Sequence, residues 1–160
     1  NLYIQLNEND RFEALMKEAI EQDPNNATLY FNLGVINAQK GNREDARVYY
    51  KKTIELDSNF ESGYLNLVSL ILEGESAIVE EMNGLGNSRA DNARYDELKI
   101  KRENLYRECV PILEKLVEIN KNQEAIKTLM NIYGTLGNNE GFKKMKELIY
   151  LSQALIQEWV

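Results

Sequence analysis

The stretch that decides the fold runs from Ala27 to Phe60 and reads ATLYFNLGVINAQKGNREDARVYYKKTIELDSNF. Its apolar and aromatic residues recur every three or four positions, which is the spacing of one face of an α-helix. Gly41-Asn42 interrupts this pattern near the middle. Glycine readily adopts the left-handed conformation that ends a helix. The stretch therefore predicts two helices joined by a short turn.

Small residues lie where these two helices must approach each other. Gly34 belongs to the first predicted helix and Ala46 to the second. Tyr30, Leu33 and Asn37 share the inner face of the first helix, with Asn37 as its one polar member. The matching face of the second helix is formed by Ala46, Tyr49, Tyr50, Thr53, Ile54 and Leu56.

The chain repeats this pattern at an offset of 34 residues. The same residue type recurs in seven pairs: Ile20 and Ile54, Glu21 and Glu55, Asp23 and Asp57, Asn25 and Asn59, Tyr30 and Tyr64, Asn32 and Asn66, Leu33 and Leu67. A fixed period of this length indicates stacked helix pairs. We therefore expect an all-α chain that forms an α-α superhelix.

The repeat unit resembles a tetratricopeptide repeat, whose pattern W-x2-L-G-x2-Y is followed by a small residue, an aromatic residue and a closing proline. The matching residues are Tyr30 in place of the tryptophan, Leu33-Gly34, Ala46 and Tyr50. Asn37 departs from the tyrosine and Ser58 from the proline. The resemblance implies a right-handed solenoid whose first helices line a concave groove, and a non-catalytic scaffold that binds a protein or peptide there.

On this pattern, residues 1–160 form a single domain of four repeats. The repeats are a truncated one at 1–24, a complete one at 25–58, one with an insertion at 59–121, and a last one with a capping helix at 122–160. Residues 1–7 are expected to be the end of one helix. The next helix is expected at 9–22, with Asp10 as its N-cap and Glu13 reaching back.

The third repeat carries about 29 extra residues, because its small residue is Cys109, 63 positions after Ala46. SAIVEEM and the run Arg89–Arg107 are rich in helix formers. We therefore expect both helices of this repeat to be lengthened into a projecting hairpin, with its tip at residues 83–87. Cys109 lies on the apolar stripe and is expected to pack in the core.

Two further residues modify the expected helices. Pro111 falls inside the second lengthened helix and predicts a kink near residues 107–111. Phe142 takes the place of Ala46 in the last repeat, which predicts a wider separation of its two helices. The closing helix is expected over residues 139–159.

Composition excludes several classes of function. The formal net charge of −7 opposes non-specific nucleic-acid binding. No stretch reaches the ~18 apolar residues that membrane insertion needs. The single cysteine excludes an intramolecular disulfide framework. The chain opens without an initiating methionine, so we expect a fragment of a longer protein whose localisation is unknown. Its acidic, Asn-rich composition resembles bacterial repeat proteins.

The sequence contains no histidine, which removes Ser-His and Cys-His catalysis and histidine metal ligands. Gly84-Leu85-Gly86 is interpreted as a hairpin tip rather than a phosphate loop. The alternating residues Asp57, Asn59 and Glu61 are interpreted as a capped turn rather than a calcium loop. We predict no catalytic residue, no cofactor and no metal site. Carboxylates such as Glu80 and Glu81 are the only residues that would support an enzymatic function, and a surface loop explains them as well.

The resemblance implies where a peptide would bind. In this family an Asn before the Leu-Gly pair commonly holds the backbone of an extended peptide, and here these residues are Asn32 and Asn66. An amide can both donate and accept hydrogen bonds. The neighbours expected on the same face are Thr28, Phe31, Val35, Ala38, Ser62, Leu65 and Ser69. Both amides could also be no more than solvated polar positions, and this alternative stays open.

Lys127 and Asn131 have the four-residue spacing of one element of a carboxylate clamp, and we include them among the candidate peptide-binding residues. No lysine or arginine lies beside Asn32 or Asn66 on the predicted groove. A mixed apolar and amide groove therefore favours uncharged or weakly basic segments.

A second interpretation is helical self-assembly. The projecting hairpin, residues 75–108, could dimerise by packing its apolar residues on a neighbouring chain. These residues are Ile78, Met82, Leu98 and Leu105. A homo-oligomer is therefore the alternative to a scaffold that binds a different protein.

Overall fold

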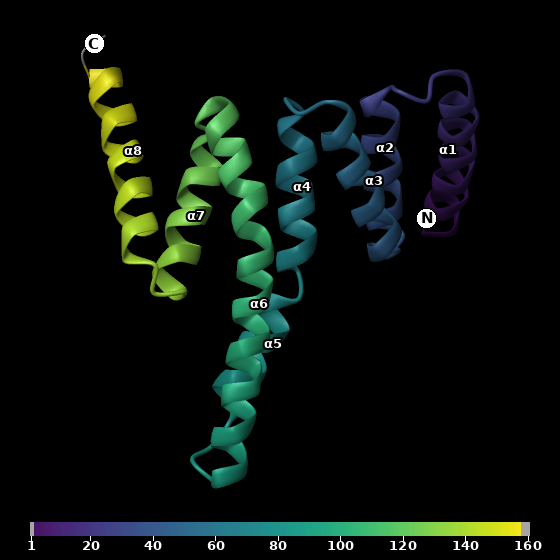
Figure 1. Ribbon diagram of the computed structural model, residues 1–160. Helices are drawn as coiled ribbons and strands as arrows, with labels where there is room; N and C mark the ends of the chain where they lie inside the picture. The colour runs from purple at the N-terminus through teal and green to yellow at the C-terminus, as the bar shows by residue number, and fades with distance from the viewer. Residues whose placement is uncertain (1, 158–160) are drawn as a thin grey trace. The chain divides into compact units, whose positions relative to one another are not determined.

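The computed structural model describes the backbone of residues 2–157, and the side chains of residues 8–152 and 154. Eight α-helices and no strand make up this described part of the chain (Figure 1). They are α1 (Leu2–Gln22), α2 (Ala27–Gln39), α3 (Arg43–Leu56), α4 (Glu61–Leu72), α5 (Glu75–Gly84), α6 (Arg89–Asn120), α7 (Gln123–Thr135) and α8 (Asn139–Gln157). The predicted all-α class is confirmed. The contacts divide the chain into two compact units, residues 1–70 and 71–160.

In the first unit, α2 and α3 form the helix pair expected from the deciding stretch. Gly41 has a φ of +79°, which is the left-handed conformation that ends α2. The backbone N–H of Asn42 donates to the carbonyl of Asn37 at 2.8 Å, and that of Gly41 to Ala38 at 3.0 Å. This pair of bonds is a Schellman motif, which satisfies the last carbonyls of the helix.

The small residues lie where α2 and α3 pack together, as predicted. Ala46 and Leu33 are almost fully buried. A Cβ added to Gly34 would lie 2.5 Å from Cε1 of Tyr50, a distance that real side chains do not tolerate. Gly34 therefore makes room for the buried ring of Tyr50.

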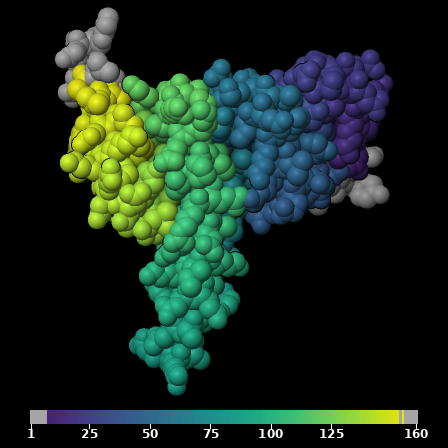
Figure 2. All heavy atoms as spheres, viewed as in Figure 1, coloured from purple at the N-terminus to yellow at the C-terminus, as the bar shows by residue number. Residues whose placement is uncertain are grey.

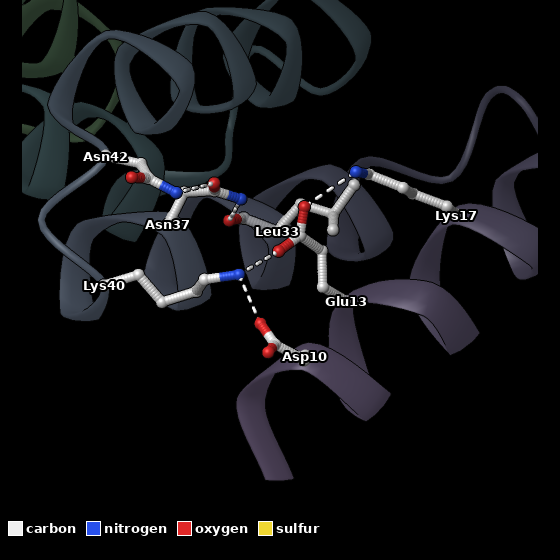
Figure 3. Close-up of polar contacts among 7 residues, drawn as sticks. All are labelled: Asp10, Glu13, Lys17, Leu33, Asn37, Lys40 and Asn42. Carbon is white, nitrogen blue, oxygen red and sulfur yellow. Dashed lines mark hydrogen bonds and ion pairs between the residues drawn. The ribbon is translucent and has the colours of Figure 1, made fainter. Parts of the chain in front are cut away.

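Asn37 is the polar member of the buried face, and its amide is fully used. It is 2% exposed. Its Nδ2 donates to the carbonyl of Leu33 at 2.9 Å, and its Oδ1 accepts from Asn42 Nδ2 at 3.2 Å (Figure 3). A buried polar group with such partners avoids the cost of desolvation. This local network explains how the repeat accommodates Asn37 in place of tyrosine.

The repeat period is visible as a repeated contact. The hydroxyl of Tyr30 donates to the carbonyl of Pro24 at 3.2 Å, and that of Tyr64 donates to Ser58 at 3.1 Å. The two bonds are related by the 34-residue offset. Ser58 therefore replaces the proline without loss of this contact, because a backbone carbonyl is the acceptor in both cases.

The expected break before residue 9 is wrong. α1 is a single helix from Leu2 to Gln22, and this range contains neither glycine nor proline to interrupt it. Asp10 is therefore no N-cap. Its carboxylate binds Lys40 Nζ at 2.6 Å, and Glu13 binds the same ammonium at 2.7 Å (Figure 3). These two carboxylates join α1 to α2.

In the second unit, only one of the two lengthened helices is continuous. α6 has 32 residues and runs through Pro111, as expected for the lengthened second helix. The first helix is interrupted at residues 73–74, so α4 and α5 are separate. Gly74 lies at this break, and glycine is unfavourable within a helix. The kink at Pro111 stays a prediction.

The hairpin of α5 and the N-terminal half of α6 extends past α7 and α8 (Figures 1 and 2). Residues 85–88 connect its helices, which confirms the predicted tip. Ser88 and Asp91 form a capping box that starts α6. Salt bridges join the two helices, with Arg94 to Glu81 at 2.7 Å as the outer one.

The base of the hairpin contains a compact polar cluster. Arg102 binds Glu75 at 2.9 Å, and the hydroxyl of Tyr106 donates to the same carboxylate. The guanidinium also lies 5.2 Å from the centre of the Tyr106 ring. One turn further along α6, Cys109 is fully buried, which confirms its predicted place in the core.

The pair α7–α8 closes the described chain and confirms the helices expected from Gln123 and from residue 139. The expected wider separation of α7 and α8 at Phe142 stays a prediction. The close approach is made by Gly141, where an added Cβ would lie 2.7 Å from Cδ2 of Tyr133. Phe142 instead packs against Gly134, at an ordinary contact distance of 3.4 Å from a Cβ added there. Residues 158–160 lie outside the described residues.

Candidate functional site

The two predicted peptide-binding amides lie in the first unit, one on α2 and one on α4. Asn32 and Asn66 are both half-buried. Neither side-chain amide makes a hydrogen bond to another residue of the described chain. Asn37, one turn further along α2, uses both ends of its amide. The amide groups of Asn32 and Asn66 therefore remain available to a ligand.

The neighbours of these amides are uncharged. Thr28, Ser62 and Ser69 are exposed, and Val35, Ala38 and Leu65 are half-buried. Phe31 is also half-buried, but it packs within the unit. Its ring centre lies 5.0 Å from that of Phe60 and 5.9 Å from that of Tyr50. Phe31 is therefore part of an aromatic cluster within the first unit.

The remaining predicted residues, Lys127 and Asn131, lie on α7 in the second unit, and both are exposed. The candidate peptide-binding residues thus fall into two groups. The first unit holds all of them except this pair.

The apolar residues named for self-assembly are largely used inside the hairpin. Ile78 is 4% exposed and Leu98 is 2% exposed. Met82 and Leu105 are half-buried. Side chains that are already covered within one protomer add little to a contact with another. The same hairpin exposes Tyr95 and Ile100, which sequence patterning did not single out.

A cleft of about 770 Å³ lies between α6, α7 and α8 in the second unit. Its floor is apolar and is formed by Val117, Leu129, Tyr133 and Met145, all buried. Its rim carries charged residues from α6 and α8. Sequence analysis missed this cleft because its residues span positions 111–148 on three helices. No single motif brings them together.

Several charges at the cleft are held by internal contacts. Tyr133 donates its hydroxyl to Glu114, and burial together with this carboxylate raises the pKa of Tyr133. Lys115 binds Glu118 at 2.8 Å, which lowers the pKa of that carboxyl. The remaining rim charges are Lys121, Lys144 and Glu140, none of which forms a salt bridge within the described residues.

The ion pairs between α1 and α2 are structural. Lys40 donates to Asp10 and to Glu13, which raises its pKa to about 12. Hydrogen bonds from Lys17 and then Lys40 lower the pKa of Glu13 (Figure 3). These groups bind one another, so they stabilise the helix contact rather than offer a site.

The carboxylates considered for an enzyme show no special environment. Glu81 binds Arg94, which lowers the pKa of its carboxyl. Glu80 is exposed. In the part of the chain that the structure describes, no group of three or more acidic or cysteine residues is arranged to hold a metal ion. No described helix is both long enough and apolar enough to span a bilayer.

Two family models match the N-terminal part of the chain, and both are described as tetratricopeptide repeat. One matches residues 15–48, which cover the end of α1, all of α2 and the start of α3. The other matches residues 1–26. No curated protein matches the chain.

Several solved structures match most of the chain at low sequence identity. YrrB, a TPR protein with an unusual peptide-binding site, is 17% identical over 92% of this chain and 79% of its own, with a TM-score of 0.42. MamA protein is 22% identical over 89% of this chain and 81% of its own, with a TM-score of 0.40. A thermophilic TPR protein in Thermus thermophilus is 16% identical over 90% of this chain and 84% of its own, with a TM-score of 0.37. Scores below 0.5 do not by themselves establish a common fold.

The similarity to tetratricopeptide repeats rests on the two model matches and on the helix pairs themselves. The hydrogen bond of Tyr30 to Pro24 recurs 34 residues later as that of Tyr64 to Ser58, which follows the period of such repeats. Proteins built from such repeats are typically non-catalytic scaffolds that bind proteins or peptides. Residues 1–48 are therefore similar to tetratricopeptide repeats, which are typical of protein-interaction scaffolds.

Proposed function

We propose that the first unit binds an extended, uncharged peptide segment of a partner protein along α2 and α4. The observation that carries this proposal is the pair Asn32 and Asn66. These amides occupy equivalent positions in successive first helices, are half-buried, and have no partner within the described chain.

The amide group suits an extended backbone. Such a backbone presents carbonyl oxygens and N–H groups in alternation, and an asparagine can bond to either. Two amides one repeat apart can therefore hold one segment in a defined register. Affinity then depends on backbone hydrogen bonds, and specificity on the side chains that meet Val35 and Leu65.

The absence of charge among the named neighbours sets the class of ligand. Thr28, Ser62 and Ser69 supply hydroxyls, and the other neighbours are apolar. A charged side chain that loses water without gaining a partner is unfavourable. Segments rich in small, hydroxylated and aliphatic residues should therefore bind better than charged ones.

The proposal is tested with an array of synthetic nonapeptides that have blocked termini and no charged residue. We expect the best of them to bind with micromolar affinity in titration calorimetry. Each amide is expected to contribute about 1 kcal/mol, or roughly fivefold in affinity. Asn32→Ala with Asn66→Ala should weaken binding by about 25-fold.

The matched control is Asn92→Ala, which removes an exposed amide from α6. This variant should bind the selected peptide as the unmodified protein does. Unchanged affinity in the Asn32/Asn66 double variant would reject the proposed site. An equal loss in the Asn92 variant would reject it as well.

Self-assembly through the hairpin has less support, because Ile78 and Leu98 are covered inside it. Light scattering compares the unmodified protein with a Tyr95→Ser, Ile100→Ser variant, which removes the two exposed apolar side chains. A dimer mass that falls to the monomer mass in this variant would favour self-assembly. A monomer mass for both proteins rules it out.

A further inference from the structure

We propose that Asn83, near the tip of the hairpin, is a site of spontaneous deamidation that converts it to aspartate and isoaspartate. Asn83 is the one asparagine of the chain that a glycine follows. It lies where α5 ends (Figure 1). The modification is independent of the amide site on α2 and α4, because leucine follows both Asn32 and Asn66.

The reaction is an attack within the chain. The backbone nitrogen of Gly84 forms a bond to Cγ of Asn83, and the bond from Cγ to Nδ2 breaks. The leaving nitrogen takes the proton of the backbone amide and departs as ammonia, which leaves a cyclic succinimide. Water then adds to one of the two ring carbonyls, and ring opening gives aspartate or isoaspartate. The net change is one water consumed and one ammonia released, so no oxidant or reductant is needed.

The surroundings of Asn83 leave the reacting groups accessible. Asn83 and Gly84 are both exposed, and the amide of Asn83 forms no hydrogen bond with another described residue. A Cβ added to Gly84 would have no atom within 4 Å. Because glycine carries no side chain, its backbone nitrogen can approach Cγ in conformations that other residues do not adopt. Water also reaches both residues.

The last turn of α5 is weakly held. Gly84 is the last residue of this helix, and glycine is unfavourable within a helix. The N–H of Leu85 donates to the carbonyl of Met82 at 3.4 Å, which is a long bond over three residues instead of four. Helix ends fray readily. Fraying releases Asn83 from the helical conformation, which keeps its Cγ away from the Gly84 nitrogen.

The start of α6 provides an internal comparison. Asn87 is also exposed at the tip, and a small residue, Ser88, follows it. The N–H of Ser88 donates to Oδ2 of Asp91 at 3.1 Å, as part of the capping box. This bond holds the nitrogen that would attack Asn87. The structure therefore favours deamidation at Asn83 and opposes it at Asn87, although the two are only four positions apart.

The products change the tip and leave the base of the hairpin as it is. A new carboxylate at the C-terminal end of α5 meets the negative end of the helix dipole, close to Glu80 and Glu81. Isoaspartate also lengthens the main chain before Gly84, so the connection to α6 must shift. Glu75, which binds Arg102, begins α5 at its other end. We therefore expect the modification to loosen the tip alone.

The test incubates the full chain at neutral pH in water labelled with heavy oxygen and follows each asparagine by tandem mass spectrometry. We expect Asn83 to convert first, to give both products, and to gain one labelled oxygen in each. Gly84→Ala should slow the conversion about tenfold, because its Cβ restricts the backbone. This variant should fold normally, since the added Cβ lies in open space.

A matched variant tests the role of the capping box. Asp91→Ala frees the N–H of Ser88 and should raise the conversion of Asn87 by about fivefold, which corresponds to the loss of one hydrogen bond. Hydrogen exchange then compares the deamidated chain with the starting chain. We expect faster exchange over residues 81–91 and unchanged exchange around Glu75 and Arg102.

Three outcomes would overturn the proposal. The first is conversion of Asn83 only in the chain unfolded by urea, because the helix would then protect it. The second is equal conversion of Asn83 and Asn87 in the folded starting chain. The third is conversion without a labelled oxygen, since opening of the succinimide requires water. Binding of the selected peptide at Asn32 and Asn66 should be the same before and after deamidation, which separates this test from that of the amide site.

Discussion

Two helix pairs can be compared, α2–α3 in the first unit and α7–α8 in the second. Their turns have the same geometry, but the helix that supplies the glycine at the packing contact differs. Gly41 and Gly137 have φ values of +79° and +70°. The residue after each glycine donates its N–H to a carbonyl five positions earlier, at 2.8 Å in both pairs. The turn geometry is thus the same in both pairs, and it satisfies the same helix carbonyls in both places.

The packing contact is reversed between these pairs. In α2–α3 the glycine is on the first helix, where Gly34 makes room for Tyr50 of the second. In α7–α8 the tyrosine is on the first helix, where Tyr133 lies over Gly141 of the second. In both arrangements a tyrosine ring packs against a glycine, whose missing Cβ leaves room for the ring. The comparison shows that either helix of a pair can supply the glycine on which the tyrosine ring packs.

The largest expected effect is that of Asn37→Asp, at the position where α7 has Tyr133. An ionised carboxylate there could not donate to the Leu33 carbonyl, and its charge would be buried. We expect a loss of about 3 kcal/mol in unfolding free energy at pH 7, measured by urea denaturation. The loss should shrink toward pH 4, as the new carboxyl becomes protonated.

The half-buried Asn32 provides the control for this substitution. Asn32→Asp introduces the same charge at a position that water can reach, so it should cost less than about 1 kcal/mol. Equal losses for the two variants would contradict the structural role that we assign to the amide of Asn37.

The next effect separates the two packing contacts. A Cβ at Gly34 or at Gly141 would overlap a tyrosine ring, and the cost of overpacking exceeds the gain of about 1 kcal/mol in helix propensity. We expect Gly34→Ala and Gly141→Ala each to lose about 2 kcal/mol in urea denaturation. Gly84→Ala is the control, since nothing lies within 4 Å of its added Cβ.

A second substitution sharpens this comparison. Tyr50→Leu should reduce the cost of Gly34→Ala and leave that of Gly141→Ala unchanged, because the ring of Tyr50 contacts only the first glycine. If Tyr50→Leu relieved both variants equally, the assignment of each ring to its own glycine would be wrong.

The shared turn predicts equal effects in both units. Gly41→Ala and Gly137→Ala place a Cβ in the left-handed region, but in open space. We expect each to cost about 1 kcal/mol in the same denaturation experiment, because the strain depends on φ alone. Asn in place of either glycine should recover part of the loss, since Asn tolerates this conformation better than Ala.

The smallest effects are pH-dependent and differ in direction between the units. In the first unit, Lys17 and Lys40 lower the pKa of Glu13 below its ordinary value of 4.5. This contribution is present above that value and is lost as the pH falls through the lowered pKa. Glu13→Gln should therefore reduce the loss of stability in acid, by about 1 kcal/mol or less.

In the second unit, burial and Glu114 raise the pKa of Tyr133 above its ordinary value of 10.0. This contribution is fully present below that value and is lost as the pH rises above it, because the unfolded chain releases the proton first. In Tyr133→Phe, the free energy of unfolding should therefore fall less steeply as the pH rises above 10, and its dependence on pH in acid should not change. A change in the acid limb would contradict the assignment.

Local patterning predicted the helices and the turns, and failed where helices meet. The apolar spacing and Gly41-Asn42 were enough to place α2 and α3, because helix propensity and the left-handed glycine act over a few residues. The same reasoning wrongly expected a break before residue 9 and a continuous helix through Gly74. Both errors concern whether a helix continues or is interrupted. A single residue of low helix propensity can decide this, and most of the stability of a helix comes from its packing against neighbouring helices.

The candidate sites divide in the same way. Asn32 and Asn66 follow from the repeat period, because equivalent positions recur every 34 residues. Their lack of internal partners, and the full use of Asn37, could be learned only from the structure. The cleft at α6, α7 and α8 had no sequence signal, since its floor joins residues from three helices.

The sequence by itself determined the period, the all-α class and the turn at each glycine, because these depend on the spacing and conformational preference of neighbouring residues. The tertiary structure alone decided which ring meets which glycine, which amides are already bonded, and which lysines lack a partner in the described chain. Those properties depend on side chains far apart in the sequence that only packing brings within contact distance.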